Sequence, residues 1–528
     1  MEKENELLSI QEASAWATDY LGKEVSTSNI SYLIQYGRVR KIGENSSTQI
    51  YKSDLEKYYK SYLGKREVEW KNELGEDLNW ALSFDNLTEK ERTKHVHRLH
   101  PYKGKFIPQL VEYFLDNHTD DFKKEVYFNP GDIILDPFCG SGTALVQANE
   151  LGLHGIGIDI SAFNAMMSNI KTRRHDLFKL HDEIRKISIA LKEFFAERQN
   201  IPFESELNEE LSNFNNKYFP SPDYKYRVRQ GEINQYQFGA EKEKEFLVIY
   251  ERLLKKHNVD LKQREEKTFL DKWFAKPVRE EINFIFDIIR NQEDVETRAA
   301  LALILSRTMR SCRATTHSDL ATLINPIFDT YYCQKHGKIC KPIFTINGWW
   351  DTYSKDTIKR LSVFSSKRTK TYQYCLTGDS RTINIFDELE TKHKTFADLA
   401  INKKINGIFS SPPYVGLIDY HEQHAYAYDL FGFERKDELE IGPLYKGQGR
   451  EAKESYVIGI SDVLINCKKY LVDDYNIFLV ANDKYGLYPK IVNRAGMKIV
   501  NEFKRPVLHR TEKIKNPYSE IIFHIKDR

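Results

Sequence analysis

Residues 132–160 constrain the fold more than any other stretch of this 528-residue chain. An apolar run, DIILD, leads through PFCGSGT into ALVQANELG and then into a second apolar run, HGIGIDI. Short apolar runs bounded by glycine-rich turns indicate buried strands, and a helix commonly ends at a glycine. The stretch therefore predicts a strand, a turn, a helix and a second strand, which is the repeating unit of an α/β sheet.

The same alternation returns after a long interruption. TYQYCLTGDS, NGIFSSPPY and YNIFLVAN read as strands with their turns, and the chain closes on the hairpin-like YSEIIFHI. Residues 162–370 instead hold helical segments such as EINFIFDIIRN and RAALALILSRTMRS. We therefore expect one α/β sheet formed by residues 99–161 and 371–528, divided by a large helical insertion.

The first 62 residues have a pattern of their own. Ser9 and Glu12 have capping-box spacing, which indicates the start of a helix. A second helix with an apolar face at Ile30–Ile34 is followed by a glycine that would end it. RVRKIG and TQIYKSDLEKYY then read as a short basic hairpin leading into another helix. This arrangement resembles the winged helix-turn-helix of the MerR and excisionase type and implies a DNA-binding module. A docking or dimerisation module is the alternative. Residues 63–98 are charged and weakly periodic, so we expect a linker there.

Composition excludes several broad classes of protein. The chain has 79 basic and 77 acidic residues and a net charge of +2, so a polyanion has to be held by local patches. With 41% hydrophobic residues it is expected to fold rather than to be disordered. Six cysteines give no dense disulfide framework, and we find neither a signal-peptide core nor an apolar run of 18 residues. We expect a soluble protein of a reducing cytoplasm without a membrane partner.

The turn after the first strand predicts a nucleoside site. Gly140 and Gly142 let a ligand approach the backbone, and the following helix offers free N–H groups. Asp159 ends the next strand, where a doubly wound fold places the carboxylate that binds ribose hydroxyls. The pattern is not G-x-G-x-x-G, so a cofactor without a pyrophosphate fits better.

LDPFCGSGT, the acid at the end of the second strand and SSPPY together resemble the S-adenosylmethionine-dependent amino-methyltransferases of DNA. The resemblance covers about Val96 to Ser161 and Thr371 to Lys526 and implies a Rossmann-like methyltransferase sheet. It implies that the glycine turn lies against the methionine part of the cofactor, that the next acid binds ribose, and that an acid after the third strand reaches the adenine amino group. The basic segment HPYKGKF would close the pocket. The cofactor residues expected in this way are Lys105, Phe106, Asp136, Phe138, Cys139, Gly140, Gly142, Thr143, Asp159 and Asp379.

SSPPY predicts the catalytic turn, because a proline pair cannot continue a strand ladder. An exocyclic amine is a weak nucleophile, since its lone pair is delocalised into the base. Hydrogen-bond acceptors that draw the hydrogens of the amine toward tetrahedral geometry make its nitrogen more nucleophilic. Ser411 Oγ and the Pro412 carbonyl are such acceptors. Pro412 and Pro413 fix them before substrate arrives. Tyr414 can stack on a base flipped from the duplex, and the methyl then passes directly from the cofactor.

Ser411 also bears on which base is modified. In the family, serine at this position is more common in cytosine-N4 enzymes, and aspartate or asparagine in adenine-N6 enzymes. We therefore expect cytosine N4 in double-stranded DNA, with adenine N6 as the alternative. The family further implies a prokaryotic cytoplasm and a cognate restriction endonuclease against which the methylation protects. Two other readings stay open: an RNA methyltransferase, since related tRNA enzymes carry a similar turn, and a non-catalytic DNA-binding regulator.

The insertion is expected to hold the target-recognition region. Arg307, Arg310 and Arg313 are three residues apart and would share one helical face if the helix continues, so we expect them to contact DNA. A solvated helix end is the alternative. After SSPPY, the segment HEQHAYAYDLFGF could line the base pocket around Asp419, Tyr420 and His421, although such a stretch is more often partly core.

YYCQKHGKIC offers a set of metal ligands. Cys333, His336 and Cys340 have a spacing that could supply three ligands to zinc, and Cys312 is the candidate for a fourth. The alternative is a hairpin with two buried thiols, and methyl transfer itself needs no metal. No metal is therefore assigned from the sequence.

Overall fold

The computed structural model describes residues 6–21, 24–43, 48–60, 70, 72–75, 77–84, 87–196, 198, 201–263, 265–317, 323–507 and 517–528. The chain divides into two compact units. The first comprises Met1–Glu69, Leu191–Glu281 and Ser311–Ile346, and the second comprises Trp70–Ala190, Ile282–Arg310 and Asn347–Arg528. The insertion expected at residues 162–370 is thus shared between both units.

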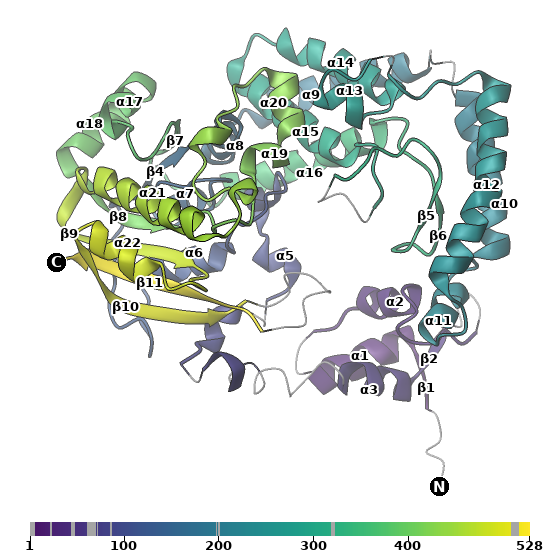
Figure 1. Ribbon diagram of the computed structural model, residues 1–528, viewed down its shortest axis with the longest axis horizontal. Helices are drawn as coiled ribbons and strands as arrows, with labels where there is room; N and C mark the ends of the chain where they lie inside the picture. The colour runs from purple at the N-terminus through teal and green to yellow at the C-terminus, as the bar shows by residue number, and fades with distance from the viewer. Residues whose placement is uncertain are drawn as a thin grey trace. The chain divides into compact units, whose positions relative to one another are not determined.

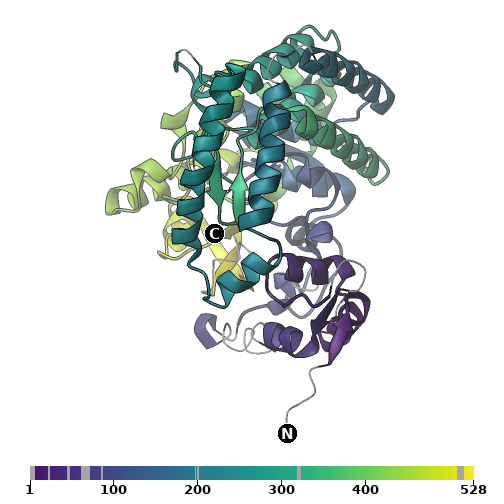
Figure 2. The same ribbon diagram turned by 90° about the vertical axis from the view of Figure 1, so that its right-hand side faces the viewer.

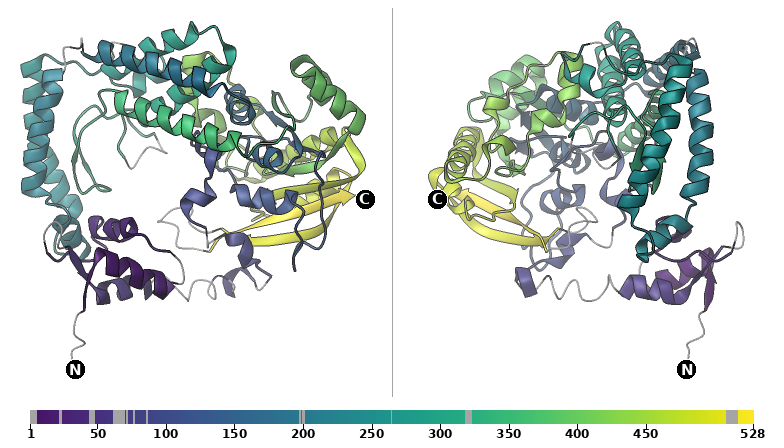
Figure 3. Two further views of the ribbon diagram at one scale, coloured as in Figure 1. Left: turned by 180° about the vertical axis from the view of Figure 1, so that it is seen from behind. Right: turned by 45° about the vertical axis from the view of Figure 1, so that its right-hand side comes forward.

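The second unit is built on a seven-stranded sheet with the order β10-β11-β9-β8-β3-β4-β7 (Figure 1). Neighbours from β9 to β7 in this order are parallel, whereas β11 is antiparallel to both β9 and β10. β10 forms the edge of the sheet near the C-terminus (Figure 3). The strands are β3 (Ile133–Asp136), β4 (His154–Asp159), β7 (Gln373–Thr377), β8 (Ile405–Ser410), β9 (Leu471–Ala481), β10 (Met497–Pro506) and β11 (Ser519–Asp527). This parallel-rich sheet confirms the expected α/β, Rossmann-like fold.

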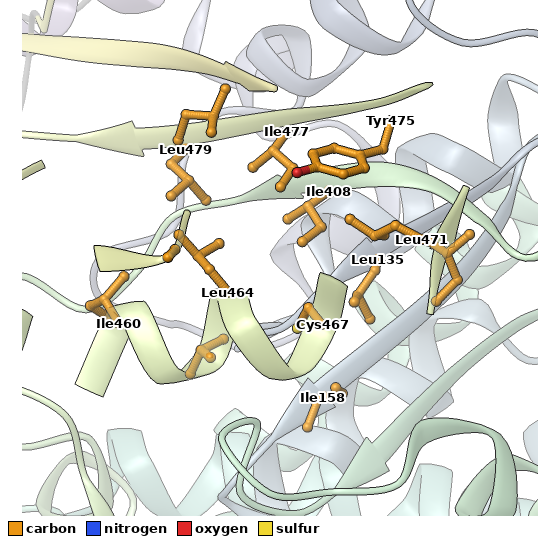
Figure 4. Packing of buried hydrophobic residues seen from close by; sticks show 14 of the residues in the cluster. Leu135, Ile158, Ile408, Ile460, Leu464, Cys467, Leu471, Tyr475, Ile477 and Leu479 are labelled. Atoms are coloured by element: carbon orange, nitrogen blue, oxygen red, sulfur yellow. The ribbon is translucent and has the colours of Figure 1, made fainter. Parts of the chain in front are cut away.

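Side chains of the central strands alternate between two hydrophobic layers. Leu135 and Ile408 belong to one cluster, and their neighbours Ile134 and Phe409 belong to the other. Figure 4 shows Leu464 of α21 within the first cluster. Each fully buried side chain of this size contributes about 1.5–3 kcal/mol. The first face is covered by α17 (Ile385–Lys392), α18 (Lys394–Lys403), α21 (Arg450–Lys468) and α22 (Tyr488–Arg494), and the second by α6 (Pro108–Leu115) and α7 (Thr143–Glu150).

Further helices complete this unit and its connections to the first unit. Within the expected linker, the Asn79 N–H donates to the Lys504 carbonyl of β10 at 2.8 Å, so this part of it packs against the sheet. The chain crosses from one unit to the other within α9 (Leu177–Ala196), α14 (Lys276–Arg290) and α15 (Val295–Ser311). The remaining elements are η2 (Trp80–Ser83), α5 (Glu89–Arg92), η3 (His95–Arg98), α8 (Ala162–Thr172), α16 (Asn347–Ser365), α19 (Tyr420–Gln423), α20 (Ala425–Phe431), η4 (Asp437–Leu439) and η5 (Leu444–Lys446).

The first unit begins with a small module of helices around a two-stranded ribbon. The ribbon pairs β1 (Leu7–Ser9) with β2 (Gln49–Tyr51), and a core including Ala17 and Ile30 joins it to α1 (Ile10–Leu21), α2 (Thr27–Gln35) and α3 (Lys52–Lys60). The predicted capping box is present: the Ser9 N–H donates to Glu12 Oε2 at 2.8 Å, and the Glu12 N–H donates to Ser9 Oγ at 3.2 Å.

The rest of the first unit is helical, with one short hairpin. Figure 2 shows α10 (Ile201–Tyr218) and α12 (Gln235–His257) side by side, and both contact the hairpin of β5 (Tyr331–Cys333) and β6 (Lys338–Cys340). The remaining helices are α11 (Asp223–Arg229) and α13 (Phe269–Trp273). None of the described helices combines the length and apolar character needed to cross a bilayer.

Candidate active site

Polar residues gather where the central strands of the sheet end. Asp136 closes β3 and Asp159 closes β4. Asp379 follows β7 by two residues, and Ser411 directly follows β8. The strand order reverses between β3 and β8, and open α/β sheets bind their ligands at the carboxyl edge of such a reversal. The topology therefore brings the two sequence motifs to one edge.

A cavity that is partly open to solvent lies at this edge, and its empty space, the open part included, is about 870 Å³. Nine of the ten residues expected to contact the cofactor line it, and Gly142 is the exception. Sequence reasoning missed several lining residues that lie beside or beyond the motifs. These include Tyr102, Ser141, Ser161, Asn164, Gly378, Ser380, Leu439, Glu440 and Ile441.

The glycine turn has a backbone that other residues adopt only with strain. Gly140 has φ +50° and Gly142 has φ +76°. A Cβ on Gly140 would lie 2.9 Å from the Tyr102 ring, and one on Gly142 would lie 2.7 Å from Ser168 Oγ. Gly142 precedes α7 as its N-cap. Gly140 therefore shapes the cavity wall, whereas Gly142 lets the turn pack against the neighbouring helix.

Two buried carboxylates hold this edge together. Asp159 accepts hydrogen bonds from the Gly140 N–H at 2.7 Å and the Ser161 N–H at 2.9 Å, so it fixes the glycine turn. Asp136 accepts from Ser410 Oγ at 2.5 Å, which ties β3 to β8. Burial raises the pKa of both carboxyl groups, that of Asp136 to about 7.

Asp379 lines the cavity as one half of an ion pair. Arg381 Nε lies 2.9 Å from its Oδ1, and the Arg381 NH2 group donates to its Oδ2 at 2.6 Å. The same NH2 group donates to the Leu439 carbonyl at 3.1 Å. The carboxylate is therefore held in one orientation at the cavity wall.

A second cavity, also partly open to solvent, adjoins the first. The two share four lining residues: Gly104, Lys105, Phe106 and Ser411. Lys105 Nζ donates to the His97 carbonyl at 2.7 Å, and burial lowers the Lys105 pKa to about 8. The shared wall thus joins the segment before the first strand to Ser411, the second residue of SSPPY and the first residue after β8.

The SSPPY turn lies between these cavities. Pro413 lines the first and Tyr414 the second, while Pro412 is buried and lines neither. Ser411 Oγ donates to the Val480 carbonyl at 3.2 Å. The Tyr414 hydroxyl donates to Glu520 Oε1 at 2.8 Å, which holds its ring in the wall of the second cavity.

Glu520 is held in turn by Arg505. Arg505 Nε donates to Glu520 Oε2 at 3.1 Å, and its NH1 group donates to the Leu82 carbonyl at 3.1 Å. Both side chains are buried, with 4% of Arg505 and 7% of Glu520 exposed, and both line the second cavity. No sequence motif indicated this pair, because Arg505 and Glu520 become neighbours only when β10 pairs with β11.

The segment after SSPPY lies differently from the expectation. Tyr420 lines the first cavity, not the second, and Asp419 and His421 line neither. His421 is buried, and its Nδ1 hydrogen-bonds to Glu440. Glu440 itself lines the first cavity, so this pair supports the wall of that cavity.

The arginines expected to contact DNA are largely inside the fold. Every residue of α15 from Ala300 to Met309 is buried, and Arg307 is only 8% exposed. Its NH1 group donates to Asp356 Oδ2 at 2.7 Å. Arg310 is half-buried, and Arg313 is 5% exposed and lies beyond the end of α15. The three arginines do not share one helical face, because α15 ends at Ser311, before Arg313, and their contact with DNA stays a prediction.

The glycine turn and the SSPPY turn thus meet in the wall of one cavity at the carboxyl edge of a Rossmann-like sheet. A family model described as DNA methylase, for the N6/N4 methyltransferases, matches residues 26–165. The chain is 47% identical over 524 residues to the Type II methyltransferase M.MjaII of Methanocaldococcus jannaschii, covering 98% of this chain and 97% of that protein.

Two further relatives match shorter segments. M.MvaI of Kocuria varians is 37% identical over 22% of this chain and 24% of its own length. M.BsoBI of Geobacillus stearothermophilus is 32% identical over 18% of each. The chain belongs to the Type II DNA methyltransferases of the N4/N6 family, which use S-adenosylmethionine as methyl donor and work in restriction-modification systems.

Proposed function

We propose that this enzyme methylates the exocyclic N4 amine of cytosine within a specific sequence of duplex DNA. The observation that carries the proposal is the pair of cavities that meet at Ser411 and the Lys105–Phe106 segment. One cavity takes the cofactor, and the other takes a base flipped from the duplex. The methyl group then has to cross only their common boundary.

The residues of the first cavity fit the cofactor. Ser141 and Asn164 line it, and their Oγ and Oδ1 atoms are buried without a hydrogen-bond partner among the described residues, so a polar ligand that reaches these atoms would satisfy them. In our proposal the glycine turn faces the methionine part, Asp159 the ribose and Asp379 the adenine amino group. When bound, S-adenosylmethionine supplies a methyl group activated by its sulfonium charge.

The chain's own residues align and activate the amine. Ser411 Oγ and the Pro412 carbonyl accept its hydrogens, which localises the nitrogen lone pair toward the first cavity. The acceptors belong to a turn fixed by two prolines, so little reorganisation is needed when the base arrives. Tyr414, oriented by Glu520, stacks on the base and supplies about 1–3 kcal/mol toward the cost of flipping.

Ser411 supports cytosine over adenine, because serine at this position is the more common choice of cytosine-N4 enzymes in the family. Adenine N6 is the second candidate, since the same acceptors serve either amine. Expression in a methylation-free bacterial host followed by single-molecule kinetic sequencing distinguishes them. One motif modified at cytosine N4 is the expected result, and adenine-N6 marks would overturn the choice of base. An unmodified genome, with cofactor binding intact, would count against DNA methylation altogether.

We also propose that the N-terminal module is a winged helix-turn-helix that contacts DNA. Its support is the compact core of α1, α2 and α3 and the exposed Arg38 and Arg40 that follow α2. Deleting residues 1–62 is expected to weaken binding to duplex DNA while the cofactor Kd stays unchanged. Equal activity of the truncated protein on DNA, or a preference for tRNA, would contradict this role.

The cellular location and biological role of the enzyme follow from the same proposal. We infer that it modifies DNA in the prokaryotic cytoplasm, where its marks protect against a cognate restriction endonuclease. Digestion of DNA from an expressing host with endonucleases of defined specificity tests this: sites carrying the motif should resist cleavage.

A further inference from the structure

The hairpin of β5 and β6 collects three side chains that bind metals. Cys333 pairs with Lys338 and Tyr331 with Cys340, so the two cysteines lie on one face of the hairpin as diagonal neighbours. The Gly337 N–H donates to the Cys333 carbonyl at 2.6 Å and closes the turn that carries His336. Neither thiol forms a disulfide.

His317, from the segment after α15, completes the set. The ligand atoms of the four side chains all lie within 4.8 Å of one another. His317 Nδ1 is 3.7 Å from Cys333 Sγ, and His336 Nδ1 is 3.5 Å from Cys340 Sγ. Bonds of about 2.3 Å to sulfur and about 2.0–2.1 Å to nitrogen put these atoms about 3.6 Å apart around a tetrahedral zinc ion. Both measured separations are close to that value.

We propose that His317, Cys333, His336 and Cys340 bind one zinc ion. Two thiolates and two imidazoles suit zinc, and four protein ligands fill its tetrahedral shell, as in structural sites. The Tyr331 hydroxyl lies 2.8 Å from His317 Nδ1, a contact that the metal replaces if this nitrogen is the ligand. Cys312, the fourth ligand considered from the sequence, lies outside the cluster.

The metal has a structural purpose within the first unit. Lys225 of α11 donates to the Lys335 carbonyl in the hairpin turn at 3.0 Å, and Arg229 of α11 donates to the Tyr36 carbonyl at 2.6 Å. The four ligands belong to the first unit, whereas residues of the second unit line both cavities. Zinc therefore joins the hairpin to the segment after α15 and holds the hairpin turn that α11 contacts, and it takes no part in methyl transfer.

Metal content and cobalt spectroscopy test the site in the full-length protein. Protein incubated with zinc and freed of excess metal should retain about one ion per chain by mass spectrometry. His317→Ala and Cys340→Ser should lower retention at least about tenfold, while the matched variant Cys312→Ala keeps the wild-type content. Full zinc content in His317→Ala would overturn the proposed ligand set.

The cobalt measurement needs no variant and so does not depend on whether Cys340→Ser folds. Cobalt(II) added to the metal-free wild type should give the intense visible bands of a tetrahedral ion and a thiolate-to-cobalt charge-transfer band. A weak octahedral spectrum, or wild-type protein that retains no zinc, would overturn the proposal.

Discussion

Gly140→Ala tests the cofactor wall most directly. The new Cβ would lie 2.9 Å from the Tyr102 ring, whereas ordinary contacts begin at 3.4 Å. Overpacking of this kind costs about 1–3 kcal/mol. Tyr102 and Gly140 both line the first cavity, so we expect the Tyr102 ring to shift into the cavity and to take space from the cofactor. We expect the Kd for S-adenosylmethionine to rise about 5- to 150-fold.

Gly152→Ala is the matched control. Gly152 also has a positive φ, +78°, but a Cβ there would meet only Pro130, at 3.7 Å. Both variants should lose about 1–2 kcal/mol of folding free energy in chemical denaturation, because both force alanine into the left-handed region. Only Gly140→Ala should weaken cofactor binding in titration calorimetry.

A double variant makes the reasoning refutable. Tyr102→Ala removes the ring that the new methyl group would strike, so its effect and that of Gly140→Ala on the Kd should not add. If the effects of the two substitutions on the Kd were additive, or if Gly140→Ala and Gly152→Ala had equal Kd values, the clash with Tyr102 would not be what weakens cofactor binding.

Three further variants separate chemistry from structure. Tyr414→Phe keeps the ring but loses the hydroxyl that donates to Glu520, a bond worth about 1.5–3 kcal/mol, so the single-turnover rate should fall about 10- to 100-fold at unchanged cofactor Kd. An unchanged rate would exclude the positioning role. Arg307→Met loses its contact with Asp356 and should lower the free energy of unfolding by about 1.5–3 kcal/mol without a separate loss of DNA affinity. If this variant lost DNA affinity at unchanged stability, the result would instead support the hypothesis that Arg307 contacts DNA directly. Burial raises the Asp136 pKa to about 7, and a cationic cofactor favours its ionised form, so binding should weaken as pH falls below about 7. Calorimetry at about pH 6 and about pH 8 measures this, and Asp136→Asn should remove the difference.

The edge of the sheet that holds the first cavity was predictable because local sequence and topology agree there. Asp136 and Asp159 end consecutive strands, and parallel pairing brings strand ends to one edge without knowledge of distant contacts. The turn around Gly140 is equally local, since its glycines follow directly from the strand-turn-helix pattern.

The parts that could not be predicted depend on contacts between distant segments. Glu440 reaches the first cavity through the packing of a loop far from either motif. Arg307 stands in a helix whose spacing alone does not reveal which face is buried, and its partner Asp356 lies 49 residues further on. His317 precedes Cys333 by 16 residues in no recognisable ligand spacing. In each case tertiary packing, not periodicity, decides the role.

The hydrogen bond between Ser410 and Asp136 joins two segments that are 274 residues apart in the chain. Their strands pair directly, Ile134 with Gly407 and Leu135 with Ile408, so the chemical edge is closed by β3 and β8 themselves. The pairing of β3 and β8 therefore does not depend on the length or path of the chain between these two strands. The residues between β4 and β7 can therefore change in sequence while the two strands that end in Asp136 and Ser410 stay paired.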